Sequence, residues 1–203
     1  MGTIDNLIGR VPLLPRYILA ALLLCGLILA MVFQRAAILR DGQEVRLEVV
    51  PVDPRDLFRG DYVVLDYRIS TVSLPKDAPP AFTRGQKVFV TLQPGENGKA
   101  KAVAISSERP AASGTDIVIS GTVLSPSVCP FNESGIMDCK AGNRAVRVKY
   151  GLESYFVPQG EGKKIEATAK ARLEVVAAVA PSGQAAIKRL LIDGKPVYDE
   201  PPY

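Results

Sequence analysis

The sequence contains no histidine among its 203 residues. Without imidazole there can be no Ser-His-Asp or Cys-His catalytic unit and no histidine-ligated metal site. Cysteine is scarce too: Cys25 lies in an apolar block near the N-terminus, and Cys129 and Cys139 lie close together further along. A thiolate-bound metal would need further ligands that the chain lacks. Many enzyme classes are therefore excluded, and we expect no metal and no cofactor.

Dense positive charge is also missing. The chain carries 25 basic and 21 acidic residues, a net charge of +4, and its basic residues form no cluster of the kind that binds nucleic acid. We therefore expect no nucleic-acid partner. The length fits one medium domain with an appendage.

The longest uncharged run, YILAALLLCGLILAMVF, extends from Tyr17 to Phe33 between Arg16 and Arg35. A helix that crosses a bilayer needs about 20 apolar residues, with a lower limit near 17. A buried core helix would usually carry a polar side, and a cleaved signal peptide usually has an apolar region of only about 7 to 15 residues. The run therefore predicts an uncleaved signal-anchor that contacts the lipid bilayer through residues 17–35.

The cysteine pair bears on the orientation of this anchor. Arginines flank the run on both sides, so the positive-inside rule does not distinguish the two orientations. Cys129 and Cys139 bound a loop-like stretch, and we predict that they form a disulfide rather than two unpaired thiols. A disulfide persists only in an oxidising compartment. We therefore predict a short cytoplasmic segment, 1–16, and an extracytoplasmic domain, 36–203.

The rest of the chain has the pattern of β-strands. Val45, Leu47 and Val49 alternate with Arg46 and Glu48, as in a half-buried strand. Turn signals at 94–98, 181–184 and 193–195 separate some of the runs. Further strands are expected at Tyr62–Ile69, Val88–Gln93, Lys101–Ser106, Asp116–Leu124, Ala145–Tyr150, Arg172–Ala180, Ala185–Ile192 and Pro196–Tyr198. The predicted fold is mainly β: an antiparallel barrel or sandwich-like domain with one short helix, Glu161–Ala171.

The most distinctive segment is VPVDPRDLFRGDYVVLDYRIS, from Val50 to Ser70. Asp53 can cap a short helical turn that ends at Gly60. In the strand expected after it, alternate side chains share one face. The inward face is predicted to hold Val63, Leu65, Tyr67 and Ile69, and the outward face Tyr62, Val64, Asp66 and Arg68.

This segment resembles the pattern of the GDYXXLXY family of bacterial membrane-anchored proteins. The resemblance extends to YGLESYFVPQGEG at 150–162 and DGKPVY at 193–198, although Gln159 stands where the family is expected to have an acidic residue. It implies a single-pass anchor in the bacterial inner membrane and an extracytoplasmic domain, without a known activity. The residues of interest as motif or binding residues are Gly60, Asp61, Tyr62, Leu65, Asp66, Tyr67 and Arg68.

Two interpretations of the motif carboxylates stay open. Asp53, Asp56, Asp61 and Asp66 could do acid/base work or hold a cation. Helix capping and ion pairing with the interleaved arginines explain them more simply. In LESYFVP, the side chains of Glu153, Tyr155 and Phe156 fit either packing or a ligand rim, and packing is favoured.

The leading functional hypothesis is a non-enzymatic binding or assembly protein, with an envelope or membrane protein as its partner. A related alternative is a subunit of a membrane complex whose anchor helix itself makes contacts. The enzymatic alternative is a membrane-tethered Ser/Lys peptidase similar to signal peptidases. Such enzymes need a serine in a Ser-Met context just after the anchor. Here the first serine after the anchor is Ser70, beyond the Gly-Asp pair.

Overall fold

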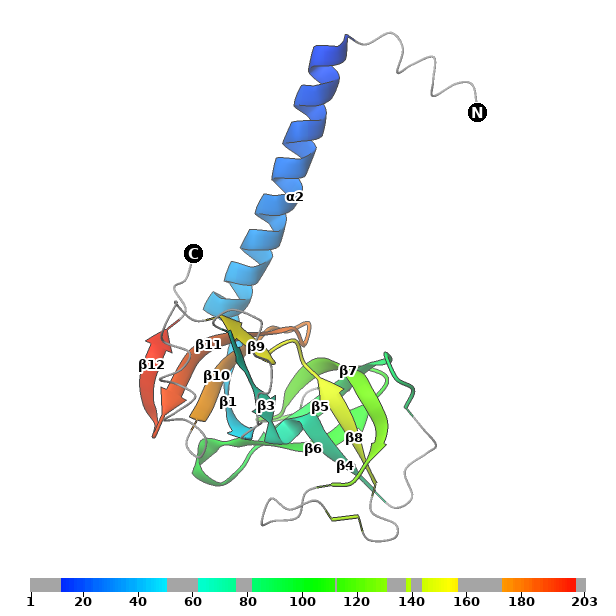
Figure 1. Cartoon of the computed structure of the whole chain (residues 1–203), viewed down its shortest axis with the longest axis vertical. Helices are drawn as coiled ribbons and strands as arrows, with labels where there is room; N and C mark the ends of the chain where they lie inside the picture. The colour runs from blue at the N-terminus through cyan, green and yellow to red at the C-terminus, as the bar shows by residue number, and fades with distance from the viewer. Residues whose placement is uncertain are drawn as a thin grey trace. The chain divides into compact units, whose positions relative to one another are not determined.

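The structure is a computed structural model of the chain and describes residues 12–50, 62–75, 82–111, 113–130, 138–139, 144–156 and 173–199. Its contacts divide the chain into two units, Met1–Ala37 and Ile38–Tyr203. Figure 1 shows one long helix, α2, and a domain of antiparallel strands. The predicted fold class, a single apolar helix followed by a mainly β domain, is confirmed.

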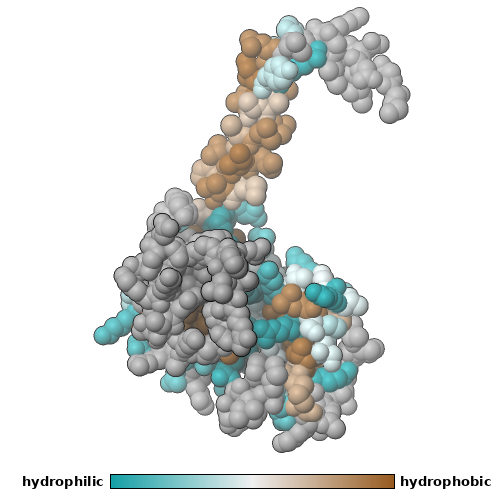
Figure 2. All heavy atoms as spheres, in the orientation of Figure 1, coloured by the Kyte–Doolittle hydropathy of each residue, from teal (hydrophilic) through white to brown (hydrophobic). Residues whose placement is uncertain are grey.

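Helix α2 extends from Leu13 to Asp41, beyond both ends of the predicted anchor. At 1.5 Å per residue a helix of 29 residues is about 43 Å long, which exceeds the roughly 30 Å of a hydrocarbon core. Its large apolar side chains, from Leu14 to Phe33, are between 48% and 72% exposed, and they form the brown stretch of Figure 2. Among the described residues, α2 is the one helix long and apolar enough to span a membrane.

In its described residues, the domain contains two five-stranded antiparallel sheets and one small sheet. The first sheet has the order β12-β11-β10-β1-β3, formed by Lys195–Asp199, Ala185–Ile192, Leu173–Val179, Gln43–Val50 and Asp66–Tyr67. The second has the order β4-β8-β7-β5-β6, formed by Thr71–Leu74, Arg144–Lys149, Ile117–Val128, Lys87–Pro94 and Ala100–Ser106. The small sheet pairs β2, Tyr62–Val64, with β9, Ser154–Phe156.

The second sheet is nearly closed into a barrel. Its end strands, β4 and β6, lie side by side (Figure 1). A parallel bridge between Arg46 of β1 and Lys99, just before β6, links the two large sheets. The inward side chains of both sheets form one hydrophobic core, which includes Leu47 and Val175 from the first sheet and Val90 from the second. The domain thus buries its apolar surface within itself.

The strand β1 shows the alternation that the sequence predicts. Val45 and Leu47 are buried, whereas Arg46 is exposed and Glu48 is half-buried. The turn from β11 to β12 also has the conformation that its sequence predicts. Asp193 and Gly194 have φ values of 52° and 73°, and two central residues with positive φ are what a type I′ hairpin requires.

The junction between α2 and β1 is tight. Gly42 donates a backbone hydrogen bond of 3.0 Å to the Ile38 carbonyl. A Cβ atom at Gly42 would lie 2.4 Å from that oxygen, so the turn has space only for glycine. In the same unit, Ile38 and Leu39 pack against Ala178 and Ala186.

The segment from Tyr62 to Ile69 differs from the prediction. It was expected to be one strand, but the structure divides it into β2, β3 and the start of a 3-10 turn, η1, Arg68–Ser70. The reason is tertiary, because β2 pairs with β9 whereas β3 pairs with β1. The strands β4 and β9 were not predicted. The expected helix Glu161–Ala171 and the expected cap at Asp53–Gly60 lie outside the described residues.

Candidate functional site

The motif segment connects all three sheets of the domain. Within 13 residues, from Tyr62 to Leu74, the chain pairs first with β9, then with β1 and finally with β8. Of the seven predicted site residues, Gly60, Asp61 and the side chain of Tyr62 lie outside the described part of the chain. The other four have defined positions.

Leu65 and Tyr67 lie in the hydrophobic core, as their predicted face requires. The Leu65 amide donates a hydrogen bond of 2.8 Å to the carbonyl of Glu153. The Tyr67 hydroxyl donates one of 2.7 Å to the carbonyl of Leu152. Both bonds join the motif to the segment that precedes β9.

A second buried tyrosine makes the reverse connection. The Tyr150 hydroxyl donates a hydrogen bond of 2.7 Å to the carbonyl of Ile69. Tyr67 and Tyr150 therefore each reach the backbone of the other's segment. The Glu153 carboxylate accepts hydrogen bonds from the amides of Tyr150, at 2.5 Å, and Gly151, at 2.9 Å. These bonds fix the turn that presents the Leu152 and Glu153 carbonyls to the motif.

Both tyrosine hydroxyls are held in the neutral form. Burial, helped by the nearby carboxylates of Glu153 and Asp66, raises the pKa of Tyr67 well above its ordinary value. Burial and the charge of Glu153 also raise the pKa of Tyr150. A neutral phenol is a hydrogen-bond donor at physiological pH, so these side chains act as structural donors rather than as proton acceptors.

Two of the polar motif side chains that the structure describes, Asp66 and Arg68, form separate ion pairs. Asp66 lies 2.5 Å from Arg147 of β8, and it also accepts a 3.0 Å hydrogen bond from the Tyr67 amide. Arg68 lies 2.9 Å from Glu48 of β1. Asp66 is therefore bonded to the second sheet and Arg68 to the first. Among the described residues, Asp66 thus pairs with Arg147 of β8, which is not one of the arginines interleaved in the motif segment.

A group of charged side chains also links the two large sheets. Glu174 of β10 lies 3.2 Å from Lys99, which precedes β6, and 3.7 Å from Arg46 of β1. Glu48 lies directly opposite Glu174 in the strand register, where two like charges would repel each other. The cations Arg46, Lys99 and Arg68 offset this repulsion.

Sequence reasoning missed Arg147 and assigned no role to Tyr150. It considered packing or a ligand rim for Glu153, whereas the Glu153 carboxylate accepts hydrogen bonds from the amides of Tyr150 and Gly151. The signal for Tyr150 and Glu153 was in the sequence, because both lie in the later block YGLES that resembles the family pattern. Arg147 carries no comparable signal. It meets Asp66 only because β8 pairs with β4.

Comparison with known proteins extends this result. The sequence profile of the GDYXXLXY protein family matches residues 24–190, from within α2 to β11. The chain belongs to the GDYXXLXY family. No curated protein and no solved structure matches the chain in the comparisons. Of the motif residues within the described ranges, Tyr62 pairs with β9, and Leu65 and Tyr67 form hydrogen bonds to the segment that precedes β9.

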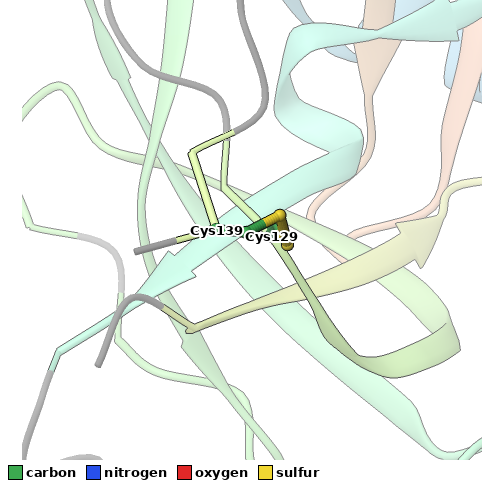
Figure 3. Close-up of a disulfide and its surroundings, with 2 residues drawn as sticks. All are labelled: Cys129 and Cys139. Atoms are coloured by element: carbon green, nitrogen blue, oxygen red, sulfur yellow. A yellow bond between two sulfur atoms is a disulfide. The ribbon is translucent and has the colours of Figure 1, made fainter. Parts of the chain in front are cut away.

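The GDYXXLXY protein also has a disulfide between Cys129 and Cys139 (Figure 3). The two Cα atoms lie 4.9 Å apart, within the usual range for this bond. The amide of Asp138 donates a 2.8 Å hydrogen bond to the carbonyl of Pro130, which closes the loop a second time. Cys25, the remaining cysteine, is exposed on α2 and unpaired.

Ser70, the first serine after the anchor, is buried at the end of η1 of this GDYXXLXY protein. Its hydroxyl has no hydrogen-bond partner within the described structure. A serine nucleophile needs both access to substrate and contact with a base. Across the described residues no group of three or more Cys, Asp or Glu side chains is placed to hold a metal ion.

Proposed function

We propose that this protein is a membrane-anchored binding or assembly module of the bacterial inner membrane, and that it acts without catalysis. Residues 17–35 would span the bilayer, 1–16 would face the cytoplasm, and 36–203 would form the extracytoplasmic domain. Its partner would be a protein of the envelope or of the membrane itself. The apolar α2 and the disulfide in the domain support this arrangement.

One observation carries the non-catalytic part of the proposal. The polar side chains of the motif region that the structure describes are bonded within the fold: Asp66 to Arg147, Arg68 to Glu48, and Tyr67 to Leu152. Groups that perform chemistry are usually gathered in one accessible place. Here they take part in three separate contacts within the fold. The motif therefore builds a scaffold, and we expect binding to use the domain surface.

The orientation can be tested with single cysteines in the full chain. In intact spheroplasts, a membrane-impermeant maleimide should label Ser107→Cys, an exposed position in the domain. Thr3→Cys should become labelled only after the membrane is lysed. The reverse pattern would place the domain in the cytoplasm and overturn the proposal.

The binding activity can be tested with a photo-crosslinking amino acid at Leu124, which is exposed on β7. Crosslinks to one envelope or membrane protein are expected, and the same probe at the buried Leu47 should give none. Exchanging α2 for an unrelated anchor should preserve these crosslinks if the domain is the binding part. Hydrolysis of envelope substrates by the purified full chain, abolished by Asp61→Ala, would contradict the proposal.

A further inference from the structure

The strands β7 and β8 pair irregularly where they approach the disulfide. From Val123 to Val128 strand β7 advances five residues, while its partner β8 advances only three, from Val148 to Ala145. The two extra residues of β7 form bulges. A bulge leaves its extra residue outside the ladder of hydrogen bonds, so this end of the pair is held less firmly than a regular ladder.

The disulfide lies directly after the end of β7. Cys129 follows directly after Val128, the last residue of β7, and is bonded to Cys139. The covalent bond and the hydrogen bond between Asp138 and Pro130 close the loop just beyond the bulged ladder. Cys139 is exposed and Cys129 half-buried, so Cys139 is the more accessible residue of the pair.

The irregular end of β8 is also where the motif is attached. Arg147 lies between the two shifts in register and forms the ion pair with Asp66. Its guanidinium also reaches the hydroxyl of Thr71, at 3.5 Å. In the ladder with β4, Arg147 is opposite Thr71 and Ala145 is opposite Ser73. Movement of the start of β8 would therefore disturb the Asp66 contact.

We propose that the Cys129–Cys139 disulfide is a redox-sensitive brace that couples the end of β7 to the Asp66–Arg147 ion pair. In the oxidised state it holds residues 145–147 of β8 in place. The reductant would be a dithiol of the kind carried by thiol–disulfide oxidoreductases. One thiolate attacks the Cys139 sulfur and releases the Cys129 thiolate, which takes up a proton. The second thiol of the dithiol then resolves the mixed disulfide, so the dithiol is oxidised and both cysteines are reduced.

Hydrogen exchange measured by mass spectrometry tests the brace directly. The full chain in detergent, with Cys25→Ser to remove the unpaired thiol, is compared before and after treatment with dithiothreitol. Amides in 125–128 and 144–149 should exchange about tenfold faster after reduction, followed by those in 66–71. Amides in 173–179 and 185–192, in the first sheet, should keep their rates. Unchanged exchange in 144–149, or an equal rise in the first sheet, would overturn the proposal.

Two variants separate the brace from a general loss of stability. The Cys129→Ser/Cys139→Ser variant should reproduce the exchange pattern of the reduced protein and no longer respond to dithiothreitol. Because coupling is reciprocal, Asp66→Asn should make the disulfide reducible at a lower ratio of reduced to oxidised dithiothreitol. An unchanged reduction midpoint in Asp66→Asn would show that the bond and the motif are independent, and would end the proposal.

Discussion

The anchor helix and the β domain use the same apolar residue types in opposite surroundings. Leu24 of α2 is 57% exposed, whereas Leu47 of β1 is fully buried. The domain removes its apolar side chains from water by packing them against each other. The helix leaves its large apolar side chains from Leu14 to Phe33 on the outside, where the hydrocarbon of a bilayer could cover them. Equal substitutions in the two regions should therefore have different consequences.

The largest effect on folding is expected from Leu47→Ala. Removing a fully buried leucine side chain should lower the free energy of unfolding of the domain by about 2 to 5 kcal/mol. Urea denaturation of the full chain in detergent, followed by far-UV circular dichroism of the β domain, measures this loss. Leu24→Ala is the matched control and should leave the denaturation midpoint unchanged. An equal loss of unfolding free energy in Leu47→Ala and Leu24→Ala would contradict the proposed difference between the domain core and the helix surface.

Charge in the helix should act on insertion rather than on folding. Leu24→Arg places a cation near the middle of the apolar run, at an apparent cost of about 2.5 to 3.5 kcal/mol for membrane insertion. The fraction of protein that stays in membranes after alkaline carbonate extraction should fall. Leu124→Arg, at an exposed position of the domain, should remain in the membrane fraction. Full retention of Leu24→Arg would contradict a spanning role for this run.

The buried tyrosines should be sensitive to loss of a single oxygen. Tyr67→Phe leaves the Leu152 carbonyl without its donor, so the free energy of unfolding should fall by about 1 to 3 kcal/mol. Chemical denaturation again provides the measurement. Tyr17→Phe is the matched change on the helix, where the side chain is 70% exposed, and it should have no effect on domain stability. If Tyr67→Phe also leaves the free energy of unfolding unchanged, the hydrogen bond to Leu152 contributes little to the stability of the domain.

Alkaline pH should weaken the domain through the same tyrosines. The folded pKa values of Tyr67 and Tyr150 are raised by burial, so the folded state keeps protons that the unfolded state loses. The stabilisation is complete below the unfolded pKa, near 10, and should decline above it by about 1.4 kcal/mol per pH unit for each tyrosine. Denaturation midpoints between pH 8 and 11 measure the slope. The Tyr67→Phe/Tyr150→Phe variant should show a shallower decline, and an unchanged slope would contradict this assignment.

The smallest effect is expected on the domain surface. Lys188 lies 2.9 Å from Glu44, and its hydrogen bond holds the pKa of that carboxyl below its usual value. Because the pair is partly exposed, Lys188→Gln should lower the free energy of unfolding by less than about 1 kcal/mol. The difference should shrink further in high salt. A loss as large as that of Leu47→Ala would show that surface charge, rather than the core, stabilises the domain.

Much of the fold could be predicted from local patterns. The alternation in β1 predicted its buried face, and Asp193–Gly194 predicted a hairpin turn, because both signals lie within a few adjacent residues. The prediction of one continuous strand from Tyr62 to Ile69 was wrong, although Leu65, Tyr67 and Ile69 are buried as predicted. Alternation reports which side faces the core, but it does not report how many partner strands the segment meets.

The sequence by itself determined that the chain has one long apolar helix and a β-rich domain with a recognisable motif, because these depend on the composition and period of contiguous residues. Only the tertiary structure decided what the motif residues contact. Tyr67 meets Leu152 across 85 positions of the sequence, and Asp66 meets Arg147 across 81. Such partners are selected by how strands pair in space, and a local pattern contains no record of that pairing.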